Sequence, residues 1–582
     1  MPLRPKQGWS HSRPGNQRGV AAILLAVSLL ALITALGFAI ELGLLYSARV
    51  DARTNAELVA LDTASAAGGC VSPADADTRL QLAQAAAAAS LARNAQPGLT
   101  LVNTQVGAQQ LRGAQRVFVP TSGVNANAVS VEVERPLPPQ IVPILPRQNQ
   151  ASVRGQAQAV RSPLVTFTVG SFLASVDPPQ LDLLNDIFSS ALGGPIIGDI
   201  VSYQGLAESF IDLGDLAAAA NQPSLLDFLT ESITLPGFLQ LLADTLINVG
   251  DAATATLINS MAAVADNTPA STVAELAGLP DDLPESAQNA RVMTFDLVRN
   301  AVVQANPVFS ITPEVEIPNL VEVIVDVALL QRPSIGIGPV LRDEGGSFVT
   351  RAQNQQASLG LDLNLKVGTL DEIVDVSLPL VLTAAEAEAI LVDTFCANAD
   401  DPESRVVLEA ETQISRLRID ETQPILSLQI DNLPIVGTVG VQVFASGEAV
   451  IGNGGRHGPH TFTSPFSATD PTLIGANTWT VHSSLGQSVA TALDTLVESL
   501  ELRLEVDVPV VGGVAEGVVN QALSPTLTTL LAQVEPALSS VLRGLDLALL
   551  NPLLGTLGIH PGGADIVVVQ FDVPPPQLIA SN

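Results

Sequence analysis

The sequence predicts an α+β protein in which a single N-terminal transmembrane helix precedes an extracytoplasmic body of alanine/leucine-rich helices and antiparallel amphipathic β-sheets. Residues 20–40 form an uncharged apolar run, residues 175–265 show helix-type apolar spacing, and residues 315–450 alternate apolar and polar side chains with a period of two. We divide the chain into a cytoplasmic basic tail (1–18), a transmembrane helix (19–46), an N-terminal module (47–161), a mainly helical region (162–310) and a β-rich ectodomain with C-terminal helices (311–582).

The charge of the chain separates a short basic tail from an acidic body. Arg4, Lys6, Arg13 and Arg18 stand in the tail without an acid among them. Since the whole chain has a net charge of -32, the remainder carries -36, the whole-chain value less the tail's +4. Phosphate and anionic lipid repel such a body, so we expect no nucleic-acid partner.

The apolar run has the length of a membrane span. Its twenty-one residues extend over about 31 Å as a helix, which matches the hydrocarbon core of a bilayer. Basic residues precede it, so the positive-inside rule predicts a single-pass protein with a cytoplasmic N-terminus and a periplasmic or surface-exposed body. The chain is rich in Ala, Leu and Val, and Lys6 and Lys366 are its two lysines. This usage is typical of a GC-rich bacterial genome, so we expect the membrane to be the bacterial inner membrane. We expect the following residues to form the anchor in contact with lipid, with the last two at the outer interface: Val20, Leu24, Leu25, Leu29, Leu32, Leu36, Ile40, Glu41 and Tyr46.

Two processing events are alternatives to a retained anchor. Gly37-Phe38-Ala39 fits a small-x-small signal-peptidase site, although the apolar run is longer than a usual signal sequence and Leu42, Leu44 and Leu45 continue it. A prepilin-type cut between Gly37 and Phe38 is disfavoured because most of the apolar helix precedes it.

The N-terminal module is expected to contain two helices followed by strands. Ser47–Ala67 and the alanine-rich Thr78–Asn94 have helical composition. Valines alternate with serine and glutamates over residues 129–134 until the prolines of 136–139. The alternation returns at 151–160, so we expect these two strands to pair antiparallel.

The order of these features resembles the N-terminal module of the TadG-like family of the tight-adherence (Flp) pilus assembly system. The likeness covers about residues 18–160 and rests on Arg18-Gly19, the apolar span, Glu41-Leu42-Gly43, Tyr46, Arg49, Asn55-Ala56 and the alanine-rich helix. The resemblance implies a membrane-anchored, non-enzymatic component of pilus assembly or cell-envelope adhesion. Its partners would be pilus or envelope assembly proteins.

Many members of that family carry a von Willebrand A-like domain with an Asp-x-Ser-x-Ser metal loop. The nearest approach here is Asp375-Val376-Ser377, but Leu378-Pro379 follows and the stretch alternates like a strand. We therefore expect no such metal site.

The helical region is expected to bury one apolar stripe, formed by Phe238, Leu241, Leu242, Leu246 and Val249. The segment 203–207 (Tyr-Gln-Gly-Leu-Ala) is expected to interrupt the helical pattern.

The alternating segments predict strands with one apolar and one wet face, and hence antiparallel sheets. The expected strands are 321–327, 359–367, 376–382, 439–443, 500–508 and 565–573, and the expected C-terminal helices are 489–500 and one that starts at Ser524-Pro525, is kinked at Pro536 and runs to Leu545. A short tail is expected to follow residues 574–576.

Few residues suggest chemistry. Cys70 and Cys396 are the chain's two cysteines and are a candidate disulfide, with two independent thiols as the alternative. His457 and His460 are expected in a glycine-rich surface hairpin tip, where metal binding is the less favoured interpretation. The sequence has no Walker A, His-Glu-x-x-His, Gly-x-Ser-x-Gly or Cys-x-x-Cys motif. We nominate no catalytic, metal or cofactor-binding residue and expect no enzyme.

Three functions are compatible with these features. The first is a membrane-anchored envelope component whose body binds proteins. The second is a periplasmic binding module for a lipid or another hydrophobic ligand, suggested by the high hydrophobicity of the body, whose amphipathic sheet and apolar helices would enclose a groove. The third is a secreted hydrolase. The oligomeric state is left open.

Overall fold

The chain forms two compact units in the computed structural model. The first contains Met1–Gln109, Arg116–Arg161 and Pro576–Asn582, and the second contains Gln110–Gln115 and Ser162–Pro575. The structure describes residues 17–69, 76–94, 98–113, 115–121, 126–137, 152–170, 178–265, 270–280, 283–313, 317–318, 320–329, 334–354, 357–368, 373–384, 387–397, 402–413, 415–433, 437–451, 454–468, 478–482, 489–499, 501–507, 540–542, 544–557 and 563–581.

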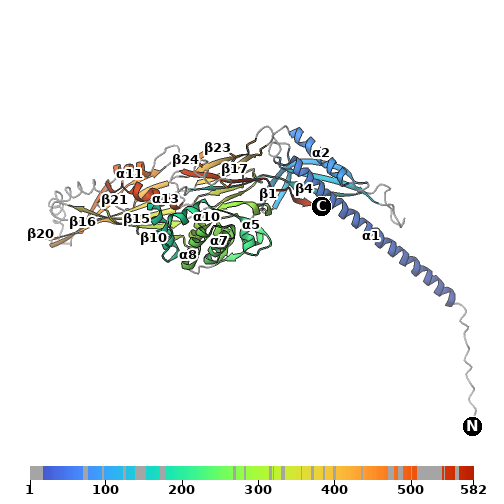
Figure 1. The fold of residues 1–582 in the computed structure, drawn as a ribbon, viewed down its shortest axis with the longest axis horizontal. Helices are drawn as coiled ribbons and strands as arrows, with labels where there is room; N and C mark the ends of the chain where they lie inside the picture. The colour runs from blue at the N-terminus through green and yellow to red at the C-terminus, as the bar shows by residue number, and fades with distance from the viewer. Residues whose placement is uncertain are drawn as a thin grey trace, which may run out of the picture. The chain divides into compact units, whose positions relative to one another are not determined.

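In the first unit, two helices pack with a β-sheet (Figure 1). Its elements are α1 (Gln17–Ala67), α2 (Ala76–Arg93), β1 (Thr100–Arg112), β2 (Gln115–Pro120), β3 (Ala128–Pro136), β4 (Ser152–Val160) and β27 (Gln577–Ser581). The order across the sheet is β1-β3-β4-β27, with β2 beside β1. The expected membrane helix and the helix after it are one continuous helix, α1.

The expected antiparallel pairing of the two N-terminal strands is confirmed. β3 and β4 pair from Ala128↔Val160 to Pro136↔Ser152 without a register shift. The expected C-terminal tail is wrong, because residues Gln577–Ser581 form β27, which pairs antiparallel with β4. Sequence patterns missed this strand because its five residues have no room to show an alternation.

Most helices of the second unit lie between Pro178 and Ala305. This segment contains α3 (Pro178–Leu192), α4 (Ile200–Glu208), α5 (Leu213–Ala219), α6 (Leu225–Thr230), α7 (Leu235–Val249), α8 (Ala252–Val264), α9 (Val273–Ala277), the 3-10 helix η1 (Glu285–Asn289), α10 (Thr294–Ala305) and the two-stranded ladders of β6 (Phe210–Asp212) with β9 (Arg291–Met293) and β7 (Ser232–Ile233) with β8 (Ser271–Thr272). The expected interruption at 203–207 is wrong. Asp199 caps α4 by accepting from the backbone N–H of Ser202, and Tyr203 is fully buried inside this helix.

A six-stranded sheet provides the amphipathic strands. Its order is β10 (Val308–Ile311), β11 (Leu320–Leu329), β15 (Ala357–Gly368), β16 (Ile373–Ala384), β19 (Ser415–Ile419) and β22 (Glu448–Ile451). The expected alternation is confirmed, since Leu359, Leu361 and Leu363 are fully buried. Val321 differs and is 57% exposed, because the register shifts between Leu320 and Glu322 and leaves it outside the ladder. Asp375-Val376-Ser377 lies within β16.

Two four-stranded sheets share a further core. One has the order β12 (Gly336–Gly338), β5 (Leu164–Val169), β26 (Gly563–Asp572), β24 (Thr478–His482), and the other β14 (Arg351–Gln353), β17 (Ala387–Phe395), β18 (Arg405–Thr412), β23 (Gly455–Thr463). Phe167, Leu391 and Ile566 meet in this core.

The pairing of β1 with β13 (Arg342–Asp343) is parallel, and every other pairing whose register is described is antiparallel.

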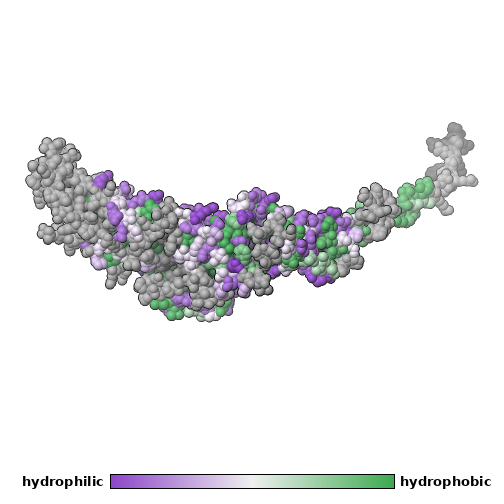
Figure 2. Space-filling view, turned by 90° about the horizontal axis from the view of Figure 1, so that it is seen from above, coloured by the Kyte–Doolittle hydropathy of each residue, from purple (hydrophilic) through white to green (hydrophobic). Residues whose placement is uncertain are grey.

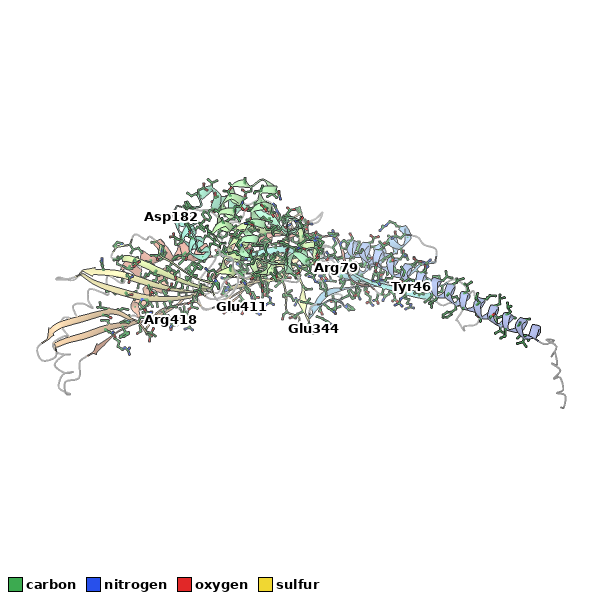
Figure 3. All side chains as sticks on the ribbon, turned by 90° about the horizontal axis from the view of Figure 1, so that it is seen from below. Tyr46, Arg79, Asp182, Glu344, Glu411 and Arg418 are labelled. Atoms are coloured by element: carbon green, nitrogen blue, oxygen red, sulfur yellow. The ribbon has the colours of Figure 1, made fainter. Side chains whose placement is uncertain are left out.

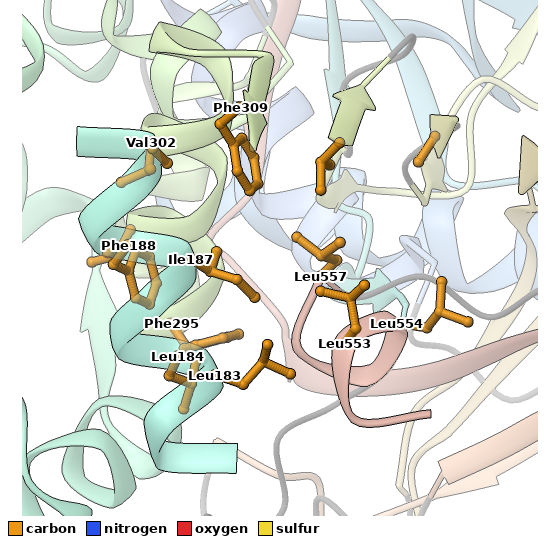
Figure 4. Close-up of a cluster of buried hydrophobic side chains, with 14 of the residues drawn as sticks. Leu183, Leu184, Ile187, Phe188, Phe295, Val302, Phe309, Leu553, Leu554 and Leu557 are labelled. Atoms are coloured by element: carbon orange, nitrogen blue, oxygen red, sulfur yellow. The ribbon is translucent and has the colours of Figure 1, made fainter. Parts of the chain in front are cut away.

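The remaining described elements are β20 (Pro424–Leu433), β21 (Gly437–Ser446) and β25 (Glu501–Asp507), which form a sheet, with α11 (Val489–Glu498), the π-helix η3 (Asp546–Leu550) and α13 (Asn551–Leu557). Segments far apart in sequence share the main core. Figure 4 shows Leu553 and Leu557 of α13 beside Ile187 of α3. The expected helix start at Ser524-Pro525 and the kink at Pro536 lie outside the described residues.

Candidate membrane anchor and its mount

The N-terminal half of α1 exposes an apolar surface. In the part of the chain that the structure describes, one helix, with a candidate span from Val20 to Ala67, is long and apolar enough to cross a membrane, and its apolar window is 6% buried. Figure 2 shows this stretch as a hydrophobic band near the N-terminal end. The first buried side chain beyond the apolar run is Ala48, which is 4% exposed. Residues 20–47 therefore leave the first unit as a helix of about 42 Å, close to the thickness of a bilayer with its headgroups.

The large apolar residues that the sequence nominates for the anchor all lie on this exposed stretch. Their side chains are exposed as follows: Val20 58%, Leu24 65%, Leu25 66%, Leu29 58%, Leu32 67%, Leu36 60%, Ile40 45% and Tyr46 71%. Glu41 is half-buried. A contiguous apolar surface of this kind indicates an interaction site or a membrane, because water does not favour it.

The two hydroxyl side chains in the run are satisfied within the helix. The Oγ of Ser28 donates to the carbonyl of Leu25 at 3.0 Å, and the Oγ1 of Thr34 donates to the carbonyl of Leu30. In hydrocarbon an unpaired polar group costs several kcal/mol. These internal hydrogen bonds make both residues compatible with a lipid environment.

The C-terminal half of α1 packs on the sheet through small side chains. Its buried stripe consists of Ala48, Ala52, Ala56, Val59, Ala60, Ala64 and Ala67, each at most 4% exposed. Their spacing of three and four residues puts them on one face of the helix. Small side chains there let the helix backbone approach the strands below.

Gly155 of β4 shows how close this approach is. A Cβ at Gly155 would lie 2.4 Å from the carbonyl carbon and oxygen of Ala52 and 2.7 Å from the backbone nitrogen of Arg53. The strand therefore touches the main chain of the helix, and only glycine fits there without movement.

Polar contacts fasten both ends of this packed segment. Near its start, the Arg135 guanidinium pairs with the Asp51 carboxylate. Near its end, the Nη1 of Arg161 donates to the carbonyl of Ser65 at 2.7 Å, and the carbonyl of Arg161 accepts from the backbone N–H of Gly69 at 2.7 Å. These contacts join α1 and the residue pair that follows it to the ends of the strands β3 and β4.

α2 packs against α1. The Asp62 carboxylate accepts from the Oγ of Ser90 at 2.5 Å and from the Nη2 of Arg93 at 2.9 Å. These hydrogen bonds, that from Ser90 above all, hold the pKa of Asp62 below its usual value. Figure 3 labels Tyr46 on the projecting part of α1 and Arg79 on α2. The buried guanidinium of Arg79 donates to the carbonyl of Ala126.

The histidines do not lie where the sequence placed them. His457 and His460 belong to strand β23 and not to a hairpin tip. The ring of His457 makes a hydrogen bond with Thr412 at 3.1 Å, and the ring of His460 stacks on Trp479 with 4.8 Å between centroids. Among the described residues, no group of three or more His, Cys, Asp and Glu side chains is placed to hold a metal ion.

The cysteine pairing is not tested. Cys396 is half-buried and lies just after β17. Cys70 lies outside the described residues, so its pairing with Cys396 stays a prediction.

The sequence predicts the exposed apolar stretch of α1, but not the packing of the rest of this helix on the sheet. In α2, Ala83 and Ala87 are fully buried. The signal that was available in α1 is an alanine at every fourth position from Ala48 to Ala64. The sequence matches no family model and no curated protein, and no solved structure matches the chain.

Proposed function

We propose that this chain is a membrane-anchored, non-enzymatic component of pilus assembly or cell-envelope adhesion, with its acidic body outside the cytoplasm binding protein partners. The observation that carries the proposal is the course of α1. An exposed apolar stretch of membrane length continues without a break into a helix that is packed on the sheet of the first unit. Within α1, no flexible linker separates the apolar stretch from the part of the helix that packs on the sheet.

The direction of insertion is supported by charge. The four basic residues of the tail precede the apolar stretch, and the acidic body follows it. The positive-inside rule keeps the tail cytoplasmic and exports the body. The resemblance of residues 18–160 to TadG-like proteins supports pilus assembly proteins as the partners.

The anchoring is tested with the full-length chain tagged at its C-terminus in a Gram-negative host. We expect the mature protein to keep residues 1–40, to sediment with the inner membrane and to lose its body when spheroplasts are treated with protease. A mature N-terminus near residue 38, or a body protected in intact spheroplasts, would overturn the proposal.

The assembly role needs a second measurement. Crosslinking of the anchored protein in cells, followed by affinity purification from detergent, is expected to recover envelope or pilus assembly proteins, and deletion of the gene is expected to reduce piliation or surface attachment. Intact piliation and attachment in the deletion strain would contradict the assembly role while leaving the anchor in place.

A further inference from the structure

Strand β27 lies at one edge of the sheet against which α1 packs. β27 pairs antiparallel with β4, from Gln577↔Val160 to Ser581↔Ala157, and it also contacts α1. β4 is thus flanked by β3 on one side and by the C-terminal strand on the other. An edge strand left open would expose unpaired backbone groups beneath the helix.

The strand just before β27 belongs to the core of the second unit. β26 pairs with β5, with Asp572 opposite Leu164, and its Val568 is 1% exposed. Four residues, 573–576, separate β26 from β27, and three residues, 161–163, separate β4 from β5.

These short links couple the two ladders. Val160 and Gln577 are partners although 417 positions separate them in sequence, so bringing them together without help closes a long loop. Once β26 pairs with β5, only the two short links remain to be closed, and the entropic cost of the β4–β27 pairing falls. Residues 574–576 are all proline and stiffen the link, which lowers that cost further.

We propose that β27 is a latch that makes the rigid mounting of the membrane helix depend on the folded state of the second unit. The latch closes when β26 occupies its place beside β5, and it opens when β26 leaves that place. The first unit then loses the strand at the β4 edge and the contact of that strand with α1. Damage to the second unit, or its incomplete folding, would in this way loosen the packing of α1 on the sheet of the first unit.

The latch is tested by amide hydrogen exchange of the full-length protein in detergent micelles. Deletion of residues 577–582 is expected to speed exchange about ten-fold or more over β4 and residues 48–67 of α1, because local opening there becomes easier. Exchange over α7 and α8 is expected to stay unchanged. The matched control is Leu578→Ala, since this β27 side chain is 42% exposed and its loss leaves the ladder intact.

The coupling is tested with Val568→Ala, which weakens β26 in its own core. We expect faster exchange at β27 and at residues 48–67 as well as at β26. A disulfide between Gln158→Cys and Ala580→Cys, which are register partners, is expected to restore slow exchange at residues 48–67 while leaving β26 fast.

Three results would overturn the latch. The first is unchanged exchange of α1 in the deletion variant, and the second is an effect of Val568→Ala confined to the second unit. The third is a disulfide between the cysteines introduced by Gln158→Cys and Ala580→Cys that links two copies of the chain more often than it forms within one copy, because β27 would then be exchanged between copies. Membrane sedimentation of the deletion variant reports on anchoring separately, since the apolar stretch of α1 is untouched.

Discussion

Gly155 in β4 and Ala52 in α1 touch through their main chains. A Cβ on Gly155 would lie 2.4 Å from the carbonyl carbon of Ala52, a distance that no relaxed contact has. We expect Gly155→Ala to destabilise the first unit by about 1–3 kcal/mol, as overpacking does elsewhere. Faster amide exchange over residues 48–67 of α1 is the measurement that checks this.

A matched glycine controls for the loss of backbone freedom. At Gly360 in β15 an added Cβ would meet its nearest atom, the Cβ of Asp326, at 3.5 Å, which is ordinary contact. We expect Gly360→Ala to change stability by less than about 0.5 kcal/mol. Equal effects of the two substitutions would contradict the close approach of α1 to the sheet.

Charge in the middle of the exposed stretch should prevent anchoring. We expect Leu29→Arg combined with Leu32→Arg to move the protein out of the membrane fraction, because each arginine at the centre of a span costs about 2.5–3.5 kcal/mol on insertion scales. The measurement is the share of protein that sediments with membranes after carbonate extraction.

The control for that variant lies on the same helix. Leu58 is 45% exposed but belongs to the mounted half of α1, so Leu58→Arg is expected to leave the membrane fraction unchanged. Equal loss from the membrane in both variants would show that the effect comes from misfolding and not from insertion.

The sequence predicted those elements whose pattern is long and local. Run length and periodicity are sufficient to predict three features: the apolar run of α1, the alternation of Leu359–Leu365 and the pairing of β3 with β4. Tyr203 was misassigned for a related reason. Its nine-residue helix is too short for the apolar spacing to be distinguished from a break, and the signal that marks its start is the capping residue Asp199.

What the sequence did not reveal depends on partners far along the chain. Nothing local distinguishes Gly155 from a glycine in a weak strand until α1 is placed above it. β27 has five residues, and its partner β4 ends more than 400 positions earlier. His457 and His460 stand in a glycine-rich stretch that suggests a loop, yet their ladder with β18 runs from Gly455 to Thr463 with a register shift in the middle.

The contact of α2 with α1 should weaken in acid. The pKa of Asp62 is lowered in the folded state, chiefly by the hydrogen bond from Ser90 and also by Arg93. A lowered pKa contributes stability above the unfolded value of about 3.9, and that stability is lost as the pH falls through the folded value. We therefore expect exchange over α2 to quicken relative to the rest of the chain as the pH is lowered below about 4, once exchange rates are corrected for pH.

Asp62→Asn should remove this acid sensitivity, and Ser90→Ala should reduce it, because the pKa of Asp62 then returns toward its usual value and differs less between the folded and unfolded states. Asp244→Asn on α7 serves as the control, since that residue lies in the second unit. An unaltered pH profile in both Asp62→Asn and Ser90→Ala would assign the acid effect to other groups.

A buried ion pair on α10 should be costly to break and cheap to replace. The Nη2 of Arg299 lies 2.9 Å from the Oδ1 of Asp296, and the two side chains are 9% and 4% exposed. The Oδ2 of Asp296 and the Nε of Arg299 have no hydrogen-bond partner among the described residues. Burial raises the pKa of Asp296, and the charge of Arg299 opposes that rise. The pair is therefore only partly compensated for its loss of water.

We expect Arg299→Met to destabilise the second unit by about 3–5 kcal/mol at neutral pH, because it leaves a buried carboxylate without its partner. Since the folded pKa of Asp296 is raised, the stability of this variant should fall as the pH rises from the unfolded value of about 3.9 through the folded value, and acid should restore part of it. Asp296→Asn combined with Arg299→Met removes both charges and should be more stable than Arg299→Met alone, with little dependence on pH. Thermal unfolding of the three proteins between pH 4 and 8 measures these differences. A double variant as unstable as Arg299→Met at every pH would show that lost packing of the arginine stem, and not the unpaired carboxylate, is what the single substitution costs.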